Sequence, residues 1–136
     1  MSARDLIIRH EGLRLMPYKD TVGKLTIGVG RNLDDMGISP DEAMLMLDND
    51  IARAYDYLEK YPWFTGLAEG RKAACINLMF NLGQTRFAGF KKFIAAMAAK
   101  NYVLAGDELK SSKWHGQVKI RGPEIVNLIV NEEWPV

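Results

Sequence analysis

Two carboxyl side chains near the N-terminus stand where acid–base chemistry could use them. Glu11 directly precedes Gly12, and glycine is the residue that most often follows the last turn of a helix. Asp20 lies nine residues further on, at the edge of an expected hairpin. The negative end of a helix favours the protonated form of a carboxyl group, whereas a solvated hairpin edge leaves a carboxylate ionised. A proton donor and a base could therefore be combined here, as general acid–base catalysis requires.

Local sequence signals predict the elements that must hold these two groups. Ser2 is placed to cap a short helix that Gly12 ends, and residues 21–24 are suited to the turn of a hairpin between residues 17–20 and 25–28. We expect this small antiparallel sheet to be the only one. The run Ser39-Pro40-Asp41-Glu42 then combines an N-cap, a proline at the first helical position and a glutamate three residues after the cap. It predicts a long helix over about 39–60.

The rest of the chain reads as helical. Residues 69–82 are apolar on most faces, which is typical of a buried central helix, and we expect Gly83 to end it. Further helices are expected at about 87–99, 102–110 and 120–131. The fold class is therefore α+β and mostly helical. We expect a single domain over 1–136, with a small lobe over about 1–40, the connecting helix, and a helical lobe over about 62–136.

Composition excludes several classes of protein. The chain has 136 residues, 48% of them hydrophobic and 26% charged, which are ordinary values for a globular protein. A single cysteine, Cys75, excludes an intramolecular disulfide, and two histidines leave little for a metal centre. We expect no metal, no cofactor, no membrane span and no secretory signal. The net charge of +1 argues against a nucleic-acid partner.

The segment over residues 11–30 carries an ordered pattern, E-G-x-x-x-x-x-Y-x-D-x-x-G-x-x-T-I-G-x-G. It resembles the phage-type (T-even) lysozymes, a family of glycoside hydrolases. Residues 71–83, 87–90 and 112–114 match the same family, so the resemblance covers nearly the whole chain. It implies a lysozyme-like two-lobed fold. It also implies a muramidase that hydrolyses the β-1,4 bond between N-acetylmuramic acid and N-acetylglucosamine in peptidoglycan.

The resemblance also implies roles for particular residues. Glu11 would be the general acid, Asp20 the carboxylate that handles water, and Thr26 its partner, in an inverting reaction. A threonine hydroxyl, which both donates and accepts, can orient a water molecule. The matching substrate-binding positions are Asn32, Phe80, Asn81, Phe93 and Glu108. The supporting positions are Arg121, Arg31, Asp50 and Asn77. The resemblance sets Arg121 against the acid. Arg31 stands where some relatives have histidine, and we expect it to pair with Asp50 on the long helix.

Several alternatives remain open from the sequence. The chain could be a catalytically weak wall-binding domain, although intact Glu11, Asp20 and Thr26 argue against this, or a small helical nucleic-acid or regulatory protein. The product could be a hydrolysed or an anhydro sugar, and His10 could pair with Glu124. We expect a monomer. It would stay in the host cytoplasm until release to the periplasm, or travel with the virion, as an endolysin, a tail lysozyme or a prophage enzyme.

Overall fold

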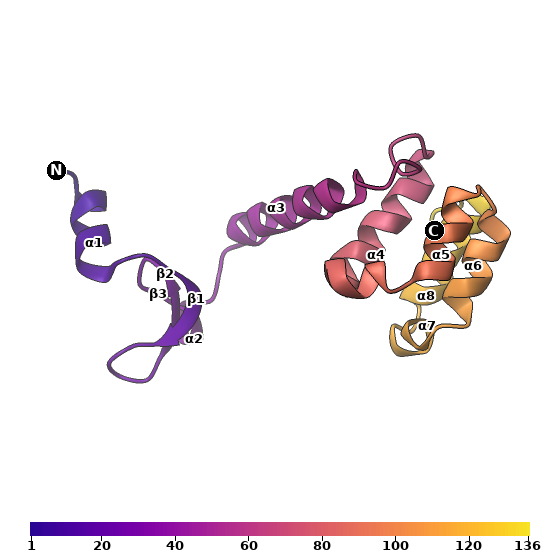
Figure 1. Ribbon diagram of the computed structural model, residues 1–136. Helices are drawn as coiled ribbons and strands as arrows, with labels where there is room; N and C mark the ends of the chain where they lie inside the picture. The colour runs from indigo at the N-terminus through magenta and orange to yellow at the C-terminus, as the bar shows by residue number, and fades with distance from the viewer. The chain divides into compact units, whose positions relative to one another are not determined.

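The computed structural model describes all residues from Met1 to Val136 and divides the chain into two compact units, Met1–Met46 and Leu47–Val136. It has eight helices and one small antiparallel sheet, which confirms the α+β, mostly helical class (Figure 1). The first unit holds the sheet and the second holds most of the helices. The elements are α1 (Ala3–Glu11), β1 (Arg14–Lys19), β2 (Leu25–Gly28), β3 (Arg31–Asn32), α2 (Leu33–Met36), α3 (Pro40–Leu58), α4 (Glu69–Ala88), α5 (Lys91–Ala98), α6 (Tyr102–Lys110), α7 (Lys113–Gln117) and α8 (Arg121–Asn131).

Helix α1 begins and ends as its sequence predicts. The Ser2 hydroxyl accepts from the Asp5 amide while the Asp5 carboxylate accepts from the Ser2 amide, so both groups of a capping box are present. Gly12 follows the last residue with a positive φ of 73°, and its N–H bonds the Ile8 carbonyl. This end geometry turns the chain directly into β1, which begins three residues after Glu11.

The sheet has the strand order β1-β2-β3, and both pairings are antiparallel. The pairing of Tyr18 with Thr26 and of Thr26 with Asn32 places Thr26 on the central strand. Strand β3 and the one-turn helix α2 were not predicted. Two and four residues, respectively, are too few to show a hydrophobic period, so nothing in the pattern marks them.

Helix α3 begins at the predicted cap. The Glu42 N–H donates to the Ser39 hydroxyl over 3.1 Å, and the Ser39 N–H donates to Glu42 Oε1 over 2.9 Å. The helix ends at Leu58, close to the expected limit. Its first residues belong to the first unit and its later residues, which include the buried Ala54 and Leu58, to the second.

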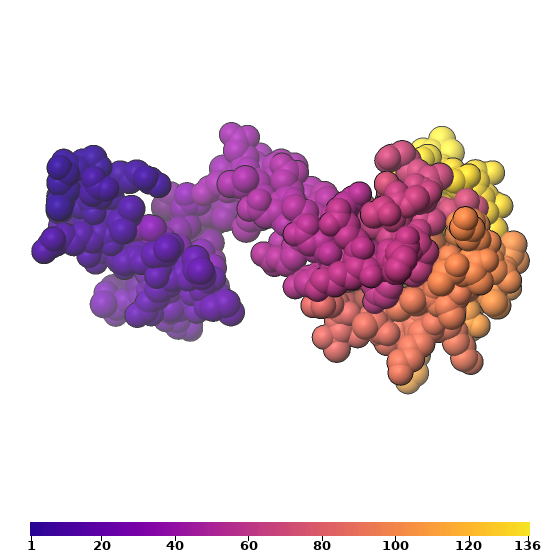
Figure 2. Space-filling model, turned by 45° about the horizontal axis from the view of Figure 1, so that its top comes forward, coloured from indigo at the N-terminus to yellow at the C-terminus, as the bar shows by residue number.

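The hydrophobic core lies entirely in the second unit. All buried apolar side chains come from residue 54 onward, and the largest fully buried ones are Phe64, Phe87, Phe93, Leu58, Leu78, Met97, Leu109, Ile129 and Cys75. Helices α4, α5, α6 and α8 pack around them, and the space-filling view shows the pink, orange and yellow segments of this unit gathered together (Figure 2). None of the helices combines the length and apolarity that crossing a membrane requires.

Two helix boundaries in the second unit differ from the prediction, and one short helix is additional. Helical structure continues beyond Gly83 to Ala88, although Gly83 itself breaks the helix with φ 79° and ψ 168°. Because residues 87–88 complete that helix, α5 begins at Lys91 instead of about 87. The short helix α7 was not predicted, although Ser112 caps it through the His115 N–H.

Candidate functional site

Glu11 lies at the last position of α1, and its side chain rests against the turn between β2 and β3. A Cβ atom built on Gly30 would lie only 2.7 Å from Glu11 Oε2. The carboxyl group therefore lies directly over the backbone of Gly30. The register of the sheet explains this contact, because Arg14 pairs with Gly28 and so brings the end of α1 alongside the residues that follow Gly28.

Asp20 is held rigidly by the hairpin turn. Its Oδ1 accepts from the N–H groups of Val22 and Lys24 over 3.0 and 2.8 Å, and its own N–H donates to the Lys24 carbonyl over 2.9 Å. Its Oδ2 makes no hydrogen bond to the protein. One oxygen of this half-buried carboxylate thus anchors the group, and the other remains able to accept a proton.

Thr26 is the only buried side chain of the first unit, with 3% of its surface exposed. Its hydroxyl donates to the Lys24 carbonyl over 2.9 Å, so the hydroxyl hydrogen is already committed. The Thr26 oxygen can then only accept, for example from a water molecule. Lys24 thus links both groups, since its N–H binds Asp20 and its carbonyl binds Thr26.

Helix α2 braces the central strand next to Thr26. Asp34 Oδ2 accepts from the Leu25 N–H over 2.7 Å, beyond the end of the short strand β3. The Lys24 ammonium pairs with Asp35 at 3.1 Å, and this pairing lowers the pKa of the Asp35 carboxyl group. The two acidic side chains therefore extend the support that β3 is too short to provide.

The expected partner of Arg31 was Asp50, and the structure corrects this. Arg31 forms a two-point ion pair with Glu42, at 2.7 Å for each nitrogen–oxygen contact, and also donates to the Gly37 carbonyl. Asp50 instead lies 3.8 Å from Arg53 on its own helix. Hydrogen bonds from Arg31 and from the Ser39 N–H lower the pKa of Glu42 to about 2. Glu42 had been assigned to the helix cap, and nothing in its spacing indicated a second role.

Asn32, a predicted substrate-binding residue, caps α2 in the structure. Its Oδ1 accepts from the Asp35 N–H, and its Nδ2 donates to the Asp35 carboxylate, each over 3.0 Å. Both ends of the amide are therefore engaged within the first unit. Asn32 borders the sheet directly, because it pairs with Thr26 across strands β2 and β3.

In the second unit, three predicted residues share the exposed face of α4. Asn77, Phe80 and Asn81 are all exposed, and positions three and four apart lie on one side of a helix. The Trp114 indole N–H donates to Asn81 Oδ1 over 2.8 Å, which leaves the amide NH₂ of Asn81 able to donate elsewhere. This orienting role of Trp114 was not predicted, since only the folded chain brings α7 to α4.

Several predicted positions of this unit also line separate cavities. Phe80 and Asp50 share one of about 220 Å³. Phe93 and Glu108 share one of about 360 Å³ together with Lys91 and Lys92, although Phe93 itself is only 2% exposed. The third cavity, of about 340 Å³, is lined by Arg121, Asn77, Glu124 and Trp134, among others.

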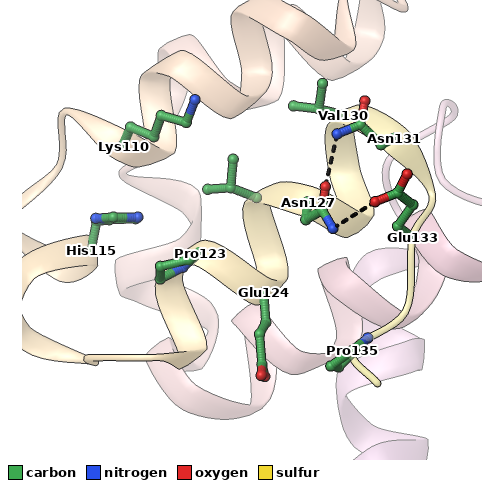
Figure 3. A pocket seen from close by; sticks show the side chains of 10 residues that line it. Lys110, His115, Pro123, Glu124, Asn127, Val130, Asn131, Glu133 and Pro135 are labelled. Atoms are coloured by element: carbon green, nitrogen blue, oxygen red, sulfur yellow. Dashed lines mark hydrogen bonds between the residues drawn. The ribbon is translucent and has the colours of Figure 1, made fainter.

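A further cavity of the second unit, about 570 Å³, contains none of the predicted site residues. Figure 3 shows it between α6, α7, α8 and the C-terminal residues. Polar side chains that line it form hydrogen bonds with one another. Asn131 donates to Asn127, and Asn127 donates to Glu133. No three histidine, cysteine or acidic side chains gather anywhere in the chain as metal ligands would.

Comparison with known proteins identifies one family and several relatives. A family model described as phage lysozyme matches residues 8–126. The chain is 27% identical to a probable T4-type lysozyme of Dictyostelium discoideum, over 93% of this chain and 92% of that protein. It is 30% identical to the SAR-endolysin of Escherichia phage Mu, over 90% of this chain and 75% of that protein. It is 26% identical to the pre-baseplate central spike protein Gp5 of Enterobacteria phage T4, over 96% of this chain but 28% of that protein.

Proposed function

Since this chain belongs to the phage lysozyme family and is a lysozyme, an enzyme that degrades peptidoglycan, we propose that it acts as an inverting muramidase. The bond cleaved is the β-1,4 linkage between N-acetylmuramic acid and N-acetylglucosamine. The observation that carries the proposal is the state of Asp20. One carboxylate oxygen is fixed by two backbone N–H groups and the other is unbonded, in the same unit as Glu11 and Thr26.

The hydrogen bonds of the first unit support a separate catalytic role for each of Glu11, Asp20 and Thr26. Glu11 donates a proton to the glycosidic oxygen as the bond to the leaving sugar breaks. Water attacks the anomeric carbon from the opposite face and gives its proton to Asp20 Oδ2. Because the Thr26 hydroxyl hydrogen is bound to the Lys24 carbonyl, the Thr26 oxygen accepts the second hydrogen of that water and directs its lone pair at the sugar.

The inverting outcome depends on room for water beside the sugar. Inverting glycosidases hold their two carboxyl groups roughly 6.5–9.5 Å apart, whereas retaining enzymes hold them about 5–5.5 Å apart. An anchored Asp20 favours the base role, because its fixed oxygen keeps the group from swinging toward the anomeric carbon.

Binding of the glycan strand is assigned to both units. We place sugar contacts at Phe80 and Asn81 on the exposed face of α4, and at Phe93 and Glu108 around their shared cavity. Asn32 contributes a sugar contact at the edge of the sheet, and its two hydrogen bonds to Asp35 hold its side chain in place there. Arg121 and Asn77, which line one cavity of the second unit, are assigned supporting roles. The chain works as a monomer. One relative is named as an endolysin and another as a phage spike protein, so the enzyme reaches the cell wall either after release from the host cytoplasm or as part of the virion.

Product analysis tests the reaction. Mass spectrometry of digested peptidoglycan should find reducing-end muramic acid, and proton NMR should find the α-anomer first. Anhydro-muramic acid would show a lytic transglycosylase instead, and a β-anomer would show retention.

Replacement of the acid tests its assignment. Glu11→Gln keeps the shape of the side chain but cannot donate the same proton, so lysis of chloroform-treated Gram-negative cells should slow by about 100-fold or more. Glu59→Gln, an exposed change on the connecting segment after α3, is the matched control and should lyse cells at the wild-type rate. Wild-type lysis by Glu11→Gln with unchanged folding would refute the assignment of the acid.

A further inference from the structure

Gly30 lies unusually close to the side chain of Glu11. Of the 12 glycines, only three would place a Cβ atom closer than 3.0 Å to another residue: Gly106 against Val130, Gly122 against His115, and Gly30 against Glu11. At Gly30 the three nearest atoms all belong to the Glu11 side chain, with Oε2 at 2.7 Å, Cδ at 2.8 Å and Cγ at 3.0 Å. The whole carboxyl end of Glu11 thus occupies the space that a side chain at position 30 would need.

Local geometry brings these two residues together. Gly30 has φ +70°, a conformation that L side chains rarely adopt, and the turn it forms joins β2 to β3. Ile27 pairs with Arg31 across that turn, which fixes Gly30 between two paired strands. Glu11 is fixed from the other side by the cap at Gly12 and by the pairing of Arg14 with Gly28.

The outer atoms of Glu11 are the flexible part of this contact. Its backbone is held by α1, but no hydrogen bond within the first unit restrains its carboxyl group. A Cβ at position 30 would therefore push the carboxyl group aside with little disturbance of the fold. Rates of catalysis are far more sensitive, since misplacement of a reacting group by 1 Å can cost about 100-fold.

From these contacts we infer that Gly30 is a positioning residue for Glu11, whose bare Cα sets where the carboxyl group lies. The inference rests on the proposed role of Glu11 as the general acid. Gly30 does not touch the substrate in this role and acts only through Glu11.

Gly28 provides a matched control in the same turn. Its φ of +71° equals that of Gly30 within one degree, so an alanine is strained by a positive φ at both positions. A Cβ on Gly28, however, would meet nothing within 4 Å. The pair Gly30→Ala and Gly28→Ala therefore separates the effect on Glu11 from the effect on the backbone.

Kinetics on defined peptidoglycan fragments test the inference. Both variants should lose a similar amount of melting temperature, but only Gly30→Ala should lower kcat, by about 100-fold, with KM changed less than about threefold. In a Glu11→Gln background, Gly30→Ala should cause no further loss, because a residue that acts through another is not additive with it. Equal kcat values for the two alanine variants, or additive losses with Glu11→Gln, would overturn the inference.

A second measurement does not depend on activity. The carboxyl carbon-13 signal of Glu11, assigned from its disappearance in Glu11→Gln, should shift in Gly30→Ala and stay unchanged in Gly28→Ala. An unchanged signal in both variants would overturn the inference even if activity fell. An inactive wild-type protein would refute the proposed function instead, and the carbon-13 signal would still decide whether Gly30 holds Glu11.

Discussion

At the scale of single residues, the site depends on which atoms are already committed to the protein. Asp20 has one oxygen bound to two backbone N–H groups, and Thr26 has its hydroxyl hydrogen bound to the Lys24 carbonyl. The second carboxylate oxygen of Asp20 and the lone pairs of the Thr26 hydroxyl remain free. These are the acceptors that a water molecule with two hydrogens requires.

Asparagine at position 20 tests this division between anchor and base. In Asp20→Asn the amide oxygen can still accept from Val22 and Lys24, while the NH₂ replaces the free oxygen. The turn should therefore keep its stability, and kcat should fall by about 100-fold or more because the base is gone. Asp20→Ala loses the anchor as well and should also melt at a lower temperature. A melting temperature equal in the two variants would contradict the anchoring role.

At the scale of elements, the first unit is held by ionic and capping contacts. Arg31 ties the end of the sheet to the first turn of α3 through Glu42, and Asp34 and Asp35 tie α2 to β2. Thr26 is its only buried residue, so apolar burial contributes little there. The geometry of the catalytic groups should consequently depend on pH more than the geometry of the second unit does.

The low pKa of Glu42 gives this dependence a direction. Its pKa is about 2 in the folded chain against an ordinary 4.5, so its contribution to stability is fully present above the ordinary value and is lost as pH falls toward 2. Glu42→Gln lacks this contribution. The gap in melting temperature between wild type and Glu42→Gln should thus narrow from about pH 7 to about pH 3. A gap that stays constant over this range would contradict the ion pair.

At the scale of the whole molecule, apolar burial is concentrated in one of the two units. Residues beyond position 53 supply every buried apolar side chain, from α3 through α8. The buried Cys75 belongs to this core, and burial raises the pKa of its thiol, which makes it a packing residue and not a nucleophile. The second unit therefore provides most of the apolar stabilisation, and the first holds the proposed acid and base.

Two leucine-to-alanine substitutions test the difference in apolar burial between the two units. Leu78 on α4 is fully buried, so Leu78→Ala should lower the free energy of unfolding by about 2–5 kcal/mol. Leu15 on β1 is 78% exposed, so Leu15→Ala should change it by less than about 0.5 kcal/mol. Urea denaturation followed by circular dichroism would measure both. Equal effects would mean that the first unit buries Leu15 in solution.

Much of the fold and site followed from local signals in the sequence. The caps at Ser2 and Ser39, the stop at Gly12 and the hairpin turn after Asp20 are short-range features, and each is satisfied by residues within four positions. The E-G-to-G-x-G pattern over residues 11–30 could also be read from the sequence, as an ordered run of residue types that resembles the family. The caps and turns could be predicted because the hydrogen bonds that produce them form between near neighbours.

Contacts between distant residues were decided only by the tertiary structure. Arg31 bonds Glu42 and not Asp50, Trp114 bonds Asn81 across 33 positions, and the Glu11 carboxyl group lies on Gly30. Charge and spacing allowed several partners for each of these groups. Strand register and helix packing selected one, because the position of a side chain in space depends on how whole elements pair and pack, which no local pattern specifies.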